Sequence, residues 1–211
     1  MRLSLIGMSG SGKSTWSRKL SGLGFRHFCC DDLITKKLAP ELTRSNGTIM
    51  ELGEWMGFPY KSQYKERESK YLAYEIDVLT EILDYLESSE DHAEENIVVD
   101  TTGSVIYAGE DILRRLRRCT IVVHLSTPPE VQELMLNAYL ANKRPVLWRD
   151  FFRKDPNETN EAALSRCYPR LLFSRERLYE QNADVRIDYY TLNQNGFGAN
   201  DFLNRVDITK A

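Results

Sequence analysis

The sequence has no apolar run long enough to span a membrane and no excess of positive charge over its 211 residues. A membrane-spanning helix needs about 20 apolar residues, whereas the longest apolar runs here have the length of a single strand. The chain carries 28 Lys and Arg against 31 Asp and Glu, a net charge of −3. Because nucleic-acid binding depends on basic surfaces that neutralise phosphates, this balance disfavours both nucleic acid and membranes as partners.

Cysteine is scarce, and the spacing of Cys29, Cys30, Cys119 and Cys167 lacks the paired CxxC pattern of zinc sites. This spacing favours reduced, buried thiols over disulfides or zinc ligands. The sequence also lacks tracts rich in proline, glycine or glutamine, so nothing marks a disordered region. The apolar stretch at residues 3–6 is interrupted too early for a signal peptide. We therefore expect a cytoplasmic protein, a monomer or weak homo-oligomer, with residues 1–211 in one domain.

The chain does contain a regular alternation of short apolar strands and amphipathic helices. A helix starting at Tyr64 is predicted by five apolar residues, from Leu72 to Leu86, at alternating steps of four and three. Residues 39–60 hold glycines and prolines without a clean period, and we expect an irregular insertion there. Strands that alternate with helices predict right-handed crossovers and a parallel sheet. The expected strands cover residues 3–6, 25–30, 97–99, 120–125 and 185–187.

Residues 7–14 match the complete GxxxxGK[ST] pattern, between an apolar strand and a helix predicted over residues 13–23. Glycines in this pattern let successive backbone N–H groups face phosphate oxygens, and the helix N-terminus adds partial positive charge. Lys13 is predicted to reach the β and γ phosphates, and the Ser14 hydroxyl to bind Mg²⁺. The alternative is a glycine-rich turn that binds no ligand. The predicted nucleotide-binding residues are Gly7, Ser9, Gly10, Ser11, Gly12, Lys13, Ser14 and Thr15.

Asp100 closes an apolar run and is therefore expected at the carboxyl end of a strand, where parallel sheets form ligand crevices. A carboxylate there holds Mg²⁺ directly or through water and neutralises charge on a transferring phosphoryl group. The predicted metal ligands are thus Ser14 and Asp100. The alternative is an Asp that caps the following turn through Thr101 and Thr102.

Five motifs follow one another along the chain: the phosphate loop, the segments 30–34 (CDDLI) and 64–68 (YKERE), the pair Arg144 and Pro145, and the run 175–179 (RERLY). In their order, which covers most of the chain, the sequence resembles the shikimate kinases. The resemblance, which extends to nucleoside monophosphate kinases, implies a three-layer α/β/α P-loop kinase fold with a mostly parallel five-stranded sheet. It also implies an acceptor-binding insertion at 35–70 and a lid at 137–170. The implied chemistry uses ATP and Mg²⁺ to transfer a phosphoryl group to a hydroxyl of a small molecule.

The resemblance assigns roles position by position. Asp31 matches the acid that contacts the acceptor hydroxyl and accepts its proton, with the neighbouring Asp32 as the alternative, because a one-residue shift in a strand reverses the side chain. Arg144 matches the lid arginine that closes on the phosphates. The predicted catalytic residues are Lys13, Asp31 and Arg144, and the predicted acceptor-binding residues are Asp31, Lys65, Gly103 and Arg175.

Arg175 stands out without the resemblance as well. It lies three to four residues from apolar positions on either side, such as Leu171 and Leu178, and so projects from an apolar stripe. An inward arginine usually has an anionic partner. That partner is either a ligand or an internal carboxylate, and the remaining alternative is an arginine whose head group reaches solvent.

The chain departs from the family at five positions. Cys29 stands where the family has a metal-side acid, Lys65 where it has an Arg, Asn137 where it has an adenine-stacking Arg in the lid, and Thr101 and Thr102 where it has glycines. Lysine lacks the planar fork with which arginine binds a carboxylate. The sequence therefore does not determine the identity of the acceptor, and two alternatives to a shikimate kinase-like function remain. One is a nucleoside or nucleotide kinase, with Trp55 or Tyr60 stacking on a base, and the other is a regulatory protein that binds ATP without turnover.

Overall fold

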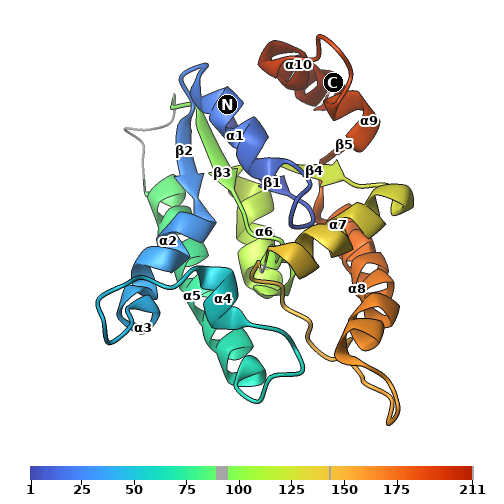
Figure 1. Ribbon diagram of the computed structural model, residues 1–211. Coiled ribbons are helices and arrows are strands. Elements are labelled where there is room, and N and C mark those ends of the chain that lie inside the picture. Colours follow the sequence, from blue (N-terminus) through green and yellow to red (C-terminus); the bar gives the residue numbers. More distant parts are fainter. Residues whose placement is uncertain (89–94, 143, 211) are drawn as a thin grey trace.

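The computed structural model describes residues 1–88, 95–142 and 144–210. Five strands form one sheet in the order β2-β3-β1-β4-β5, and every neighbouring pair is parallel. Figure 1 shows the sheet at the centre of the molecule with helices on both sides. The three-layer fold and the five-stranded sheet expected from the sequence are thus confirmed. The strands are β1 (Arg2–Ile6), β2 (Arg26–Cys29), β3 (Ile97–Asp100), β4 (Ile121–Ser126) and β5 (Val185–Asp188).

Helices connect the strands and continue to the C-terminal end of the described chain (Figure 1). The long helix expected from Tyr64 is present, and the first helix ends at Ser21, two residues earlier than expected. Among the described residues, no helix combines the length and apolar character that a bilayer-spanning segment requires. The helices are α1 (Lys13–Ser21), α2 (Cys30–Lys37), α3 (Ala39–Leu42), α4 (Leu52–Met56), α5 (Tyr64–Glu87), the 3₁₀ helix η1 (Val105–Tyr107), α6 (Glu110–Cys119), α7 (Pro129–Ala141), α8 (Asn160–Asn182), α9 (Tyr189–Leu192) and α10 (Ala199–Lys210).

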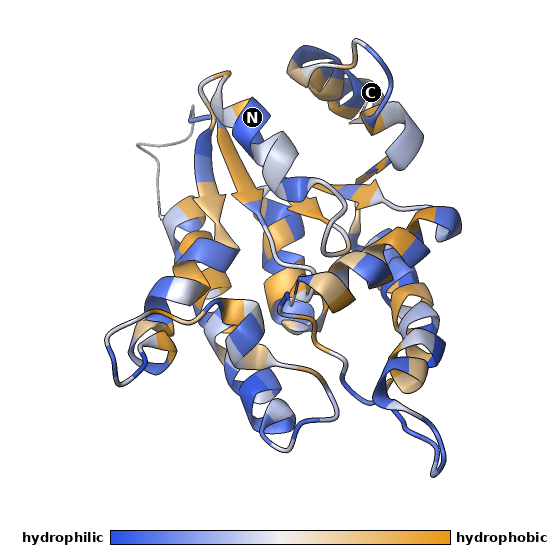
Figure 2. Ribbon diagram, viewed as in Figure 1, coloured by the Kyte–Doolittle hydropathy of each residue, from blue (hydrophilic) through white to orange (hydrophobic). Residues whose placement is uncertain are grey.

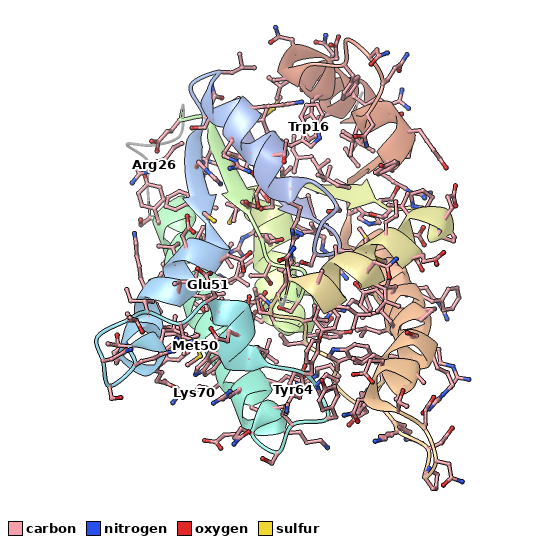
Figure 3. All side chains as sticks on the ribbon, in the orientation of Figure 1. Trp16, Arg26, Met50, Glu51, Tyr64 and Lys70 are labelled. Atoms are coloured by element: carbon pink, nitrogen blue, oxygen red, sulfur yellow. The ribbon has the colours of Figure 1, made fainter. Side chains whose placement is uncertain are left out.

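Side chains alternate across the strands and give the sheet two apolar faces. On one face, Leu3 and Leu5 of β1 pack with Trp16 of α1 and Phe202 of α10. Figure 3 shows Trp16 where α1 approaches α10, and its ring stacks on Phe202 with centroids 5.0 Å apart. The other face is covered mainly by α2, α5, α6 and α8. Figure 2 shows β3, between the two layers, as almost entirely hydrophobic, so polar groups are confined to its carboxyl end.

Two segments differ from the sequence prediction. Residues 39–60, expected to be irregular, contain α3 and α4, and α3 carries Pro40 in its first turn, where the missing N–H has no helical partner to lose. β2 ends at Cys29, so Asp31 and Asp32 lie in the first turn of α2 and not at the end of a strand. Negative side chains in that turn are stabilised by the helix dipole. Within the predicted lid at 137–170, residue 143 lies outside the described residues.

Candidate active site

The phosphate loop connects β1 to α1 and lies beside α7 (Figure 1). Its glycines at 7, 10 and 12 have φ angles of 145°, 91° and 97°, which side chains other than glycine rarely adopt. A Cβ at Gly7 would also stand 2.7 Å from the carbonyl oxygen of Leu125 in β4. The glycine pattern therefore sets the curl of the loop, and the predicted strand, loop and helix context is confirmed.

Lys13 folds back over this loop and is buried, with 7% of its surface exposed. Its ammonium donates hydrogen bonds to the carbonyl oxygens of Gly7 at 2.8 Å and Met8 at 3.0 Å. Burial lowers the pKa of Lys13, and the carboxylates of Asp100 and Asp31 oppose that shift. The ammonium is thus held against the loop, where the charges of Asp100 and Asp31 stabilise its protonated form.

A polar cavity of about 460 Å³ opens beside the loop. The loop and α1 meet there with the start of α2, the middle of α5 and the segments that follow β3 and α7. Arg18, which the sequence analysis did not single out, also lines the cavity and donates from Nε to the Ser14 carbonyl at 2.9 Å. The lining residues are Ser9, Gly10, Gly12, Lys13, Ser14, Thr15, Arg18, Asp31, Tyr71, Thr102, Gly103, Arg144 and Pro145.

Asp31 is the acid that faces this cavity, and Asp32 is not among the lining residues. Neighbouring side chains on a helix diverge by about 100°, so only one of the two points inward. The hydroxyl of Tyr71 donates to Asp31 Oδ1 at 3.1 Å. Although Asp31 is accessible to solvent, the protein around it raises the pKa of its carboxyl group, against the opposing effects of Lys13 and Tyr71. Asp31 is therefore a stronger base than an ordinary aspartate.

Arg144 and Gly103 also lie against the phosphate loop. The exposed Arg144 brings Nη1 to 3.7 Å from the place where a Cβ on Gly10 would stand. A Cβ on Gly103 would stand 3.0 Å from the backbone nitrogen of Ser9. A side chain at position 103 would therefore press on the loop, while Arg144 adds a positive charge beside it.

Two residues predicted to hold the acceptor are not among those that line the cavity. Lys65 lies on the exposed side of α5. Arg175 is 2% exposed, and its guanidinium donates to the carbonyl oxygens of Gly103 at 3.1 Å and Leu147 at 2.6 Å. These carbonyl partners take the place of the anionic partner expected from the sequence. Arg175 therefore ties the segment after β3 to the segment after α7, which carries Arg144.

A polar stripe on the inward side of α5 was not predicted from the sequence. Its members are buried and follow one another at steps of four, three and four: Tyr64, Glu68, Tyr71 and Glu75. The Tyr64 hydroxyl accepts the backbone N–H of Trp148 at 2.8 Å, and Glu68 accepts that of Arg149 at 2.8 Å. The first half of the stripe thus fixes the segment after α7, within the predicted lid, and the second half reaches the cavity through Tyr71.

Glu75 is completely buried within this stripe. Its carboxylate accepts hydrogen bonds from the hydroxyls of Thr102 and Ser104, the latter at 2.5 Å. Burial raises the pKa of Glu75 to about 7, the two hydroxyls oppose that shift, and the charge of Asp31 adds to it. Thr102 therefore anchors the loop after β3 to α5, and it also lines the cavity.

This raised pKa gives a testable stability effect. The unfolded state ionises Glu75 near pH 4.5, whereas the folded state does so near pH 7, so folding loses stability as pH rises between those values. The loss is at most about 3 kcal/mol. We expect Glu75→Gln to lack this loss, so that its stability relative to the wild type improves from pH 4.5 to pH 7.5. Urea unfolding of both proteins across that range measures the difference, and a difference that stays constant with pH would contradict the assignment.

The residues predicted to bind Mg²⁺ offer suitable oxygen donors. Ser14 lines the cavity, and Asp100 ends β3 as expected, with 3% of its surface exposed. Within the described chain, Asp100 Oδ2 has no hydrogen-bond partner. The alternative, in which Asp100 caps the turn through Thr101 and Thr102, is not supported, because both hydroxyls bond to other acceptors. Thr101 donates to the Leu5 carbonyl at 2.7 Å, and Thr102 donates to Glu75. A hydroxyl and a carboxylate with a free oxygen fit the preference of Mg²⁺.

A second, more apolar cavity of about 260 Å³ adjoins the loop. It shares Ser9, Gly10 and Arg144 with the first cavity. Its other walls come from α7, the segment after α7, α8 and α9: Val131, Leu134, Met135, Ala138, Tyr139, Val146, Tyr168 and Tyr189. A flat aromatic base attached to phosphates on the loop would find an apolar surface here.

The fold and the phosphate loop define the class: the chain has a P-loop kinase fold. It is similar to the shikimate kinase from Acinetobacter baumannii in complex with shikimate, at 24% identity over 99% of this chain and 91% of that chain, with a TM-score of 0.61. The shikimate kinase from Bacteroides thetaiotaomicron gives 16% identity, coverages of 100% and 99%, and a TM-score of 0.63. The dephospho-CoA kinase from Campylobacter jejuni is 18% identical over 99% of this chain and 95% of that chain, with a TM-score of 0.54. No protein-family model and no curated protein sequence matches the chain. The resemblance to shikimate kinases is therefore confirmed for the fold.

Proposed function

We propose that this protein is an ATP-dependent kinase that transfers the γ-phosphoryl group of ATP to a hydroxyl of a small molecule. The observation that carries the proposal is the meeting of three groups at one polar cavity: the phosphate loop with Lys13, the carboxylate of Asp31 and the guanidinium of Arg144. Phosphoryl transfer depends mainly on positioning and on the neutralisation of charge, which these groups supply.

On the nucleotide side, the backbone N–H groups of the loop bind the β and γ phosphates. The Lys13 ammonium exchanges its present carbonyl partners for phosphate oxygens, and Arg144 and Arg18 add charge from the other walls. Ser14 and Asp100 hold Mg²⁺, which offsets the negative charge of the phosphates. The apolar cavity beside α7 takes the adenine base.

On the acceptor side, Asp31 accepts the hydroxyl proton as the new O–P bond forms and the bond between the γ phosphorus and its bridging oxygen breaks, releasing ADP. The acceptor contacts Tyr71, Thr102 and Gly103, which line the rest of the cavity. Lys65 and Arg175 do not line the cavity. The proposal therefore does not require that these two residues bind a carboxylate of the acceptor. Trp55 and Tyr60, the aromatic residues suited to stacking on a nucleoside, are also absent from the lining.

A screen for acceptor-dependent release of ADP tests this function. The purified chain is incubated with ATP and Mg²⁺ and with shikimate, related hydroxy acids, sugars or nucleosides. The proposal predicts that one class of acceptor raises ADP release well above the acceptor-free rate. ATP binding without turnover on any class would favour the regulatory alternative, and turnover only with nucleosides would favour the nucleoside kinase.

The assignment of the base cavity predicts a selective effect of Ala138→Phe. Ala138 is exposed on α7, so the larger ring fits the fold but occupies the space assigned to adenine. We expect the KM for ATP to rise roughly tenfold, the loss of about 1.4 kcal/mol of binding, while the affinity for inorganic triphosphate stays unchanged. Glu133→Phe, on the opposite side of α7, is the matched control. Equal weakening of ATP and triphosphate would place the base elsewhere.

A further inference from the structure

Three side chains with metal-binding atoms meet where β2 and β3 end. His27 and Cys29 are two residues apart on β2 and therefore point to the same face of the sheet. Cys29 pairs with Asp100 in the parallel register of β2 and β3. One ligand atom of each of the three residues lies within 4.8 Å of the others. Spacing along the sequence gave no sign of this cluster, because its members come from two strands about 70 residues apart.

Two of the three ligand atoms lack a hydrogen-bond partner. His27 Nε2 and Asp100 Oδ2 are buried and form no hydrogen bond within the described residues. They face each other at 3.7 Å, too far for a hydrogen bond. Two ligands of a tetrahedral zinc ion, with bonds of about 2.1 Å, are separated by about 3.4 Å. The observed separation is therefore close to what one shared cation requires.

We propose that His27, Cys29 and Asp100 form a binding site for a zinc-type divalent cation. The chemistry of the donors supports this class of metal: imidazole nitrogen, thiolate sulfur and carboxylate oxygen together suit Zn²⁺, whereas Mg²⁺ takes oxygen donors. A bound cation gives the buried Asp100 carboxylate the partner that it lacks.

Three protein ligands leave one tetrahedral position for water or another small ligand. The site shares Asp100 with the predicted Mg²⁺ pair and differs from that pair in its other two donors, His27 and Cys29. The proposal does not depend on the kinase function, so the test is made without nucleotide or Mg²⁺.

Titration of the metal-free full chain with Co²⁺, followed by absorption spectroscopy, tests the site. One equivalent of Co²⁺ is expected to give the strong visible bands of a tetrahedral ion and a thiolate-to-cobalt charge-transfer band, and Zn²⁺ is expected to remove both. Cys29→Ser eliminates the charge-transfer band, and His27→Gln weakens Co²⁺ binding roughly tenfold or more. Cys119→Ser, which removes another half-buried free thiol, leaves the spectrum unchanged.

The proposal is overturned if the wild type shows no thiolate band, if the band survives Cys29→Ser, or if Cys119→Ser removes it. Circular dichroism establishes that each variant is folded. Thermal unfolding gives a second measurement that does not need the Cys29 variant: Zn²⁺ raises the Tm of the wild type and not that of His27→Gln. An equal shift in both proteins would also overturn the site.

Discussion

Asp31→Asn is expected to lower kcat at least roughly 100-fold, the usual contribution of a general base, while ATP binding persists. The amide keeps the shape of the side chain and its contact with Tyr71, but it accepts no proton from the acceptor. Steady-state kinetics with ATP and the acceptor found by the screen measure the effect. The raised pKa of Asp31 adds a pH signature: wild-type kcat falls on acidification at a pH above the usual aspartate range, because the protonated acid no longer serves as base.

Asp32→Asn is the matched control for this prediction. It makes the same chemical change one residue further along α2, on a side chain that does not line the cavity. We expect near wild-type kcat. If the Asp32 variant lost activity and the Asp31 variant kept it, the assignment of the base would be wrong, and α2 would have to turn by about one residue on binding substrate.

Lys13→Met is expected to lower kcat by roughly 100- to 1000-fold, the typical effect of removing one preorganised charge stabiliser. Methionine retains the length and apolar part of the side chain but supplies no positive charge to the β and γ phosphates. Rapid-quench or coupled ADP assays measure the loss. Lys19→Met, the same change on the exposed side of α1, provides the control. Full activity of the Lys13 variant would exclude a phosphate-stabilising role for this residue.

Much of the fold follows from local sequence. The strands, α1 and α5 were predicted because apolar periodicity and glycine positions depend on near neighbours. The first turn of α2 was misplaced, since an apolar run followed by two acids fits a longer strand as well as a strand followed by a helix. Residues 39–60 lacked periodicity because α3 and α4 are too short to repeat a pattern.

The candidate site was predicted unevenly. The phosphate loop is a local motif, and its context was predicted correctly. The inward stripe that ends at Glu75 was missed because only apolar residues were counted in α5, although its polar members continue the same helical spacing. The placement of Arg175 on two carbonyl oxygens depends on segments that meet only in the folded chain. The same holds for the cluster around Cys29, which exists only through strand register.

The most direct test of the proposed function is the stoichiometry of transfer. Phosphorus NMR of wild type, ATP, Mg²⁺ and the active acceptor follows the γ phosphate to its destination. The account predicts one phosphorylated acceptor for each ADP formed, and no phosphorylated acceptor on that timescale with Lys13→Met. Release of inorganic phosphate without a phosphorylated acceptor, or equal transfer by the Lys13 variant, would contradict it.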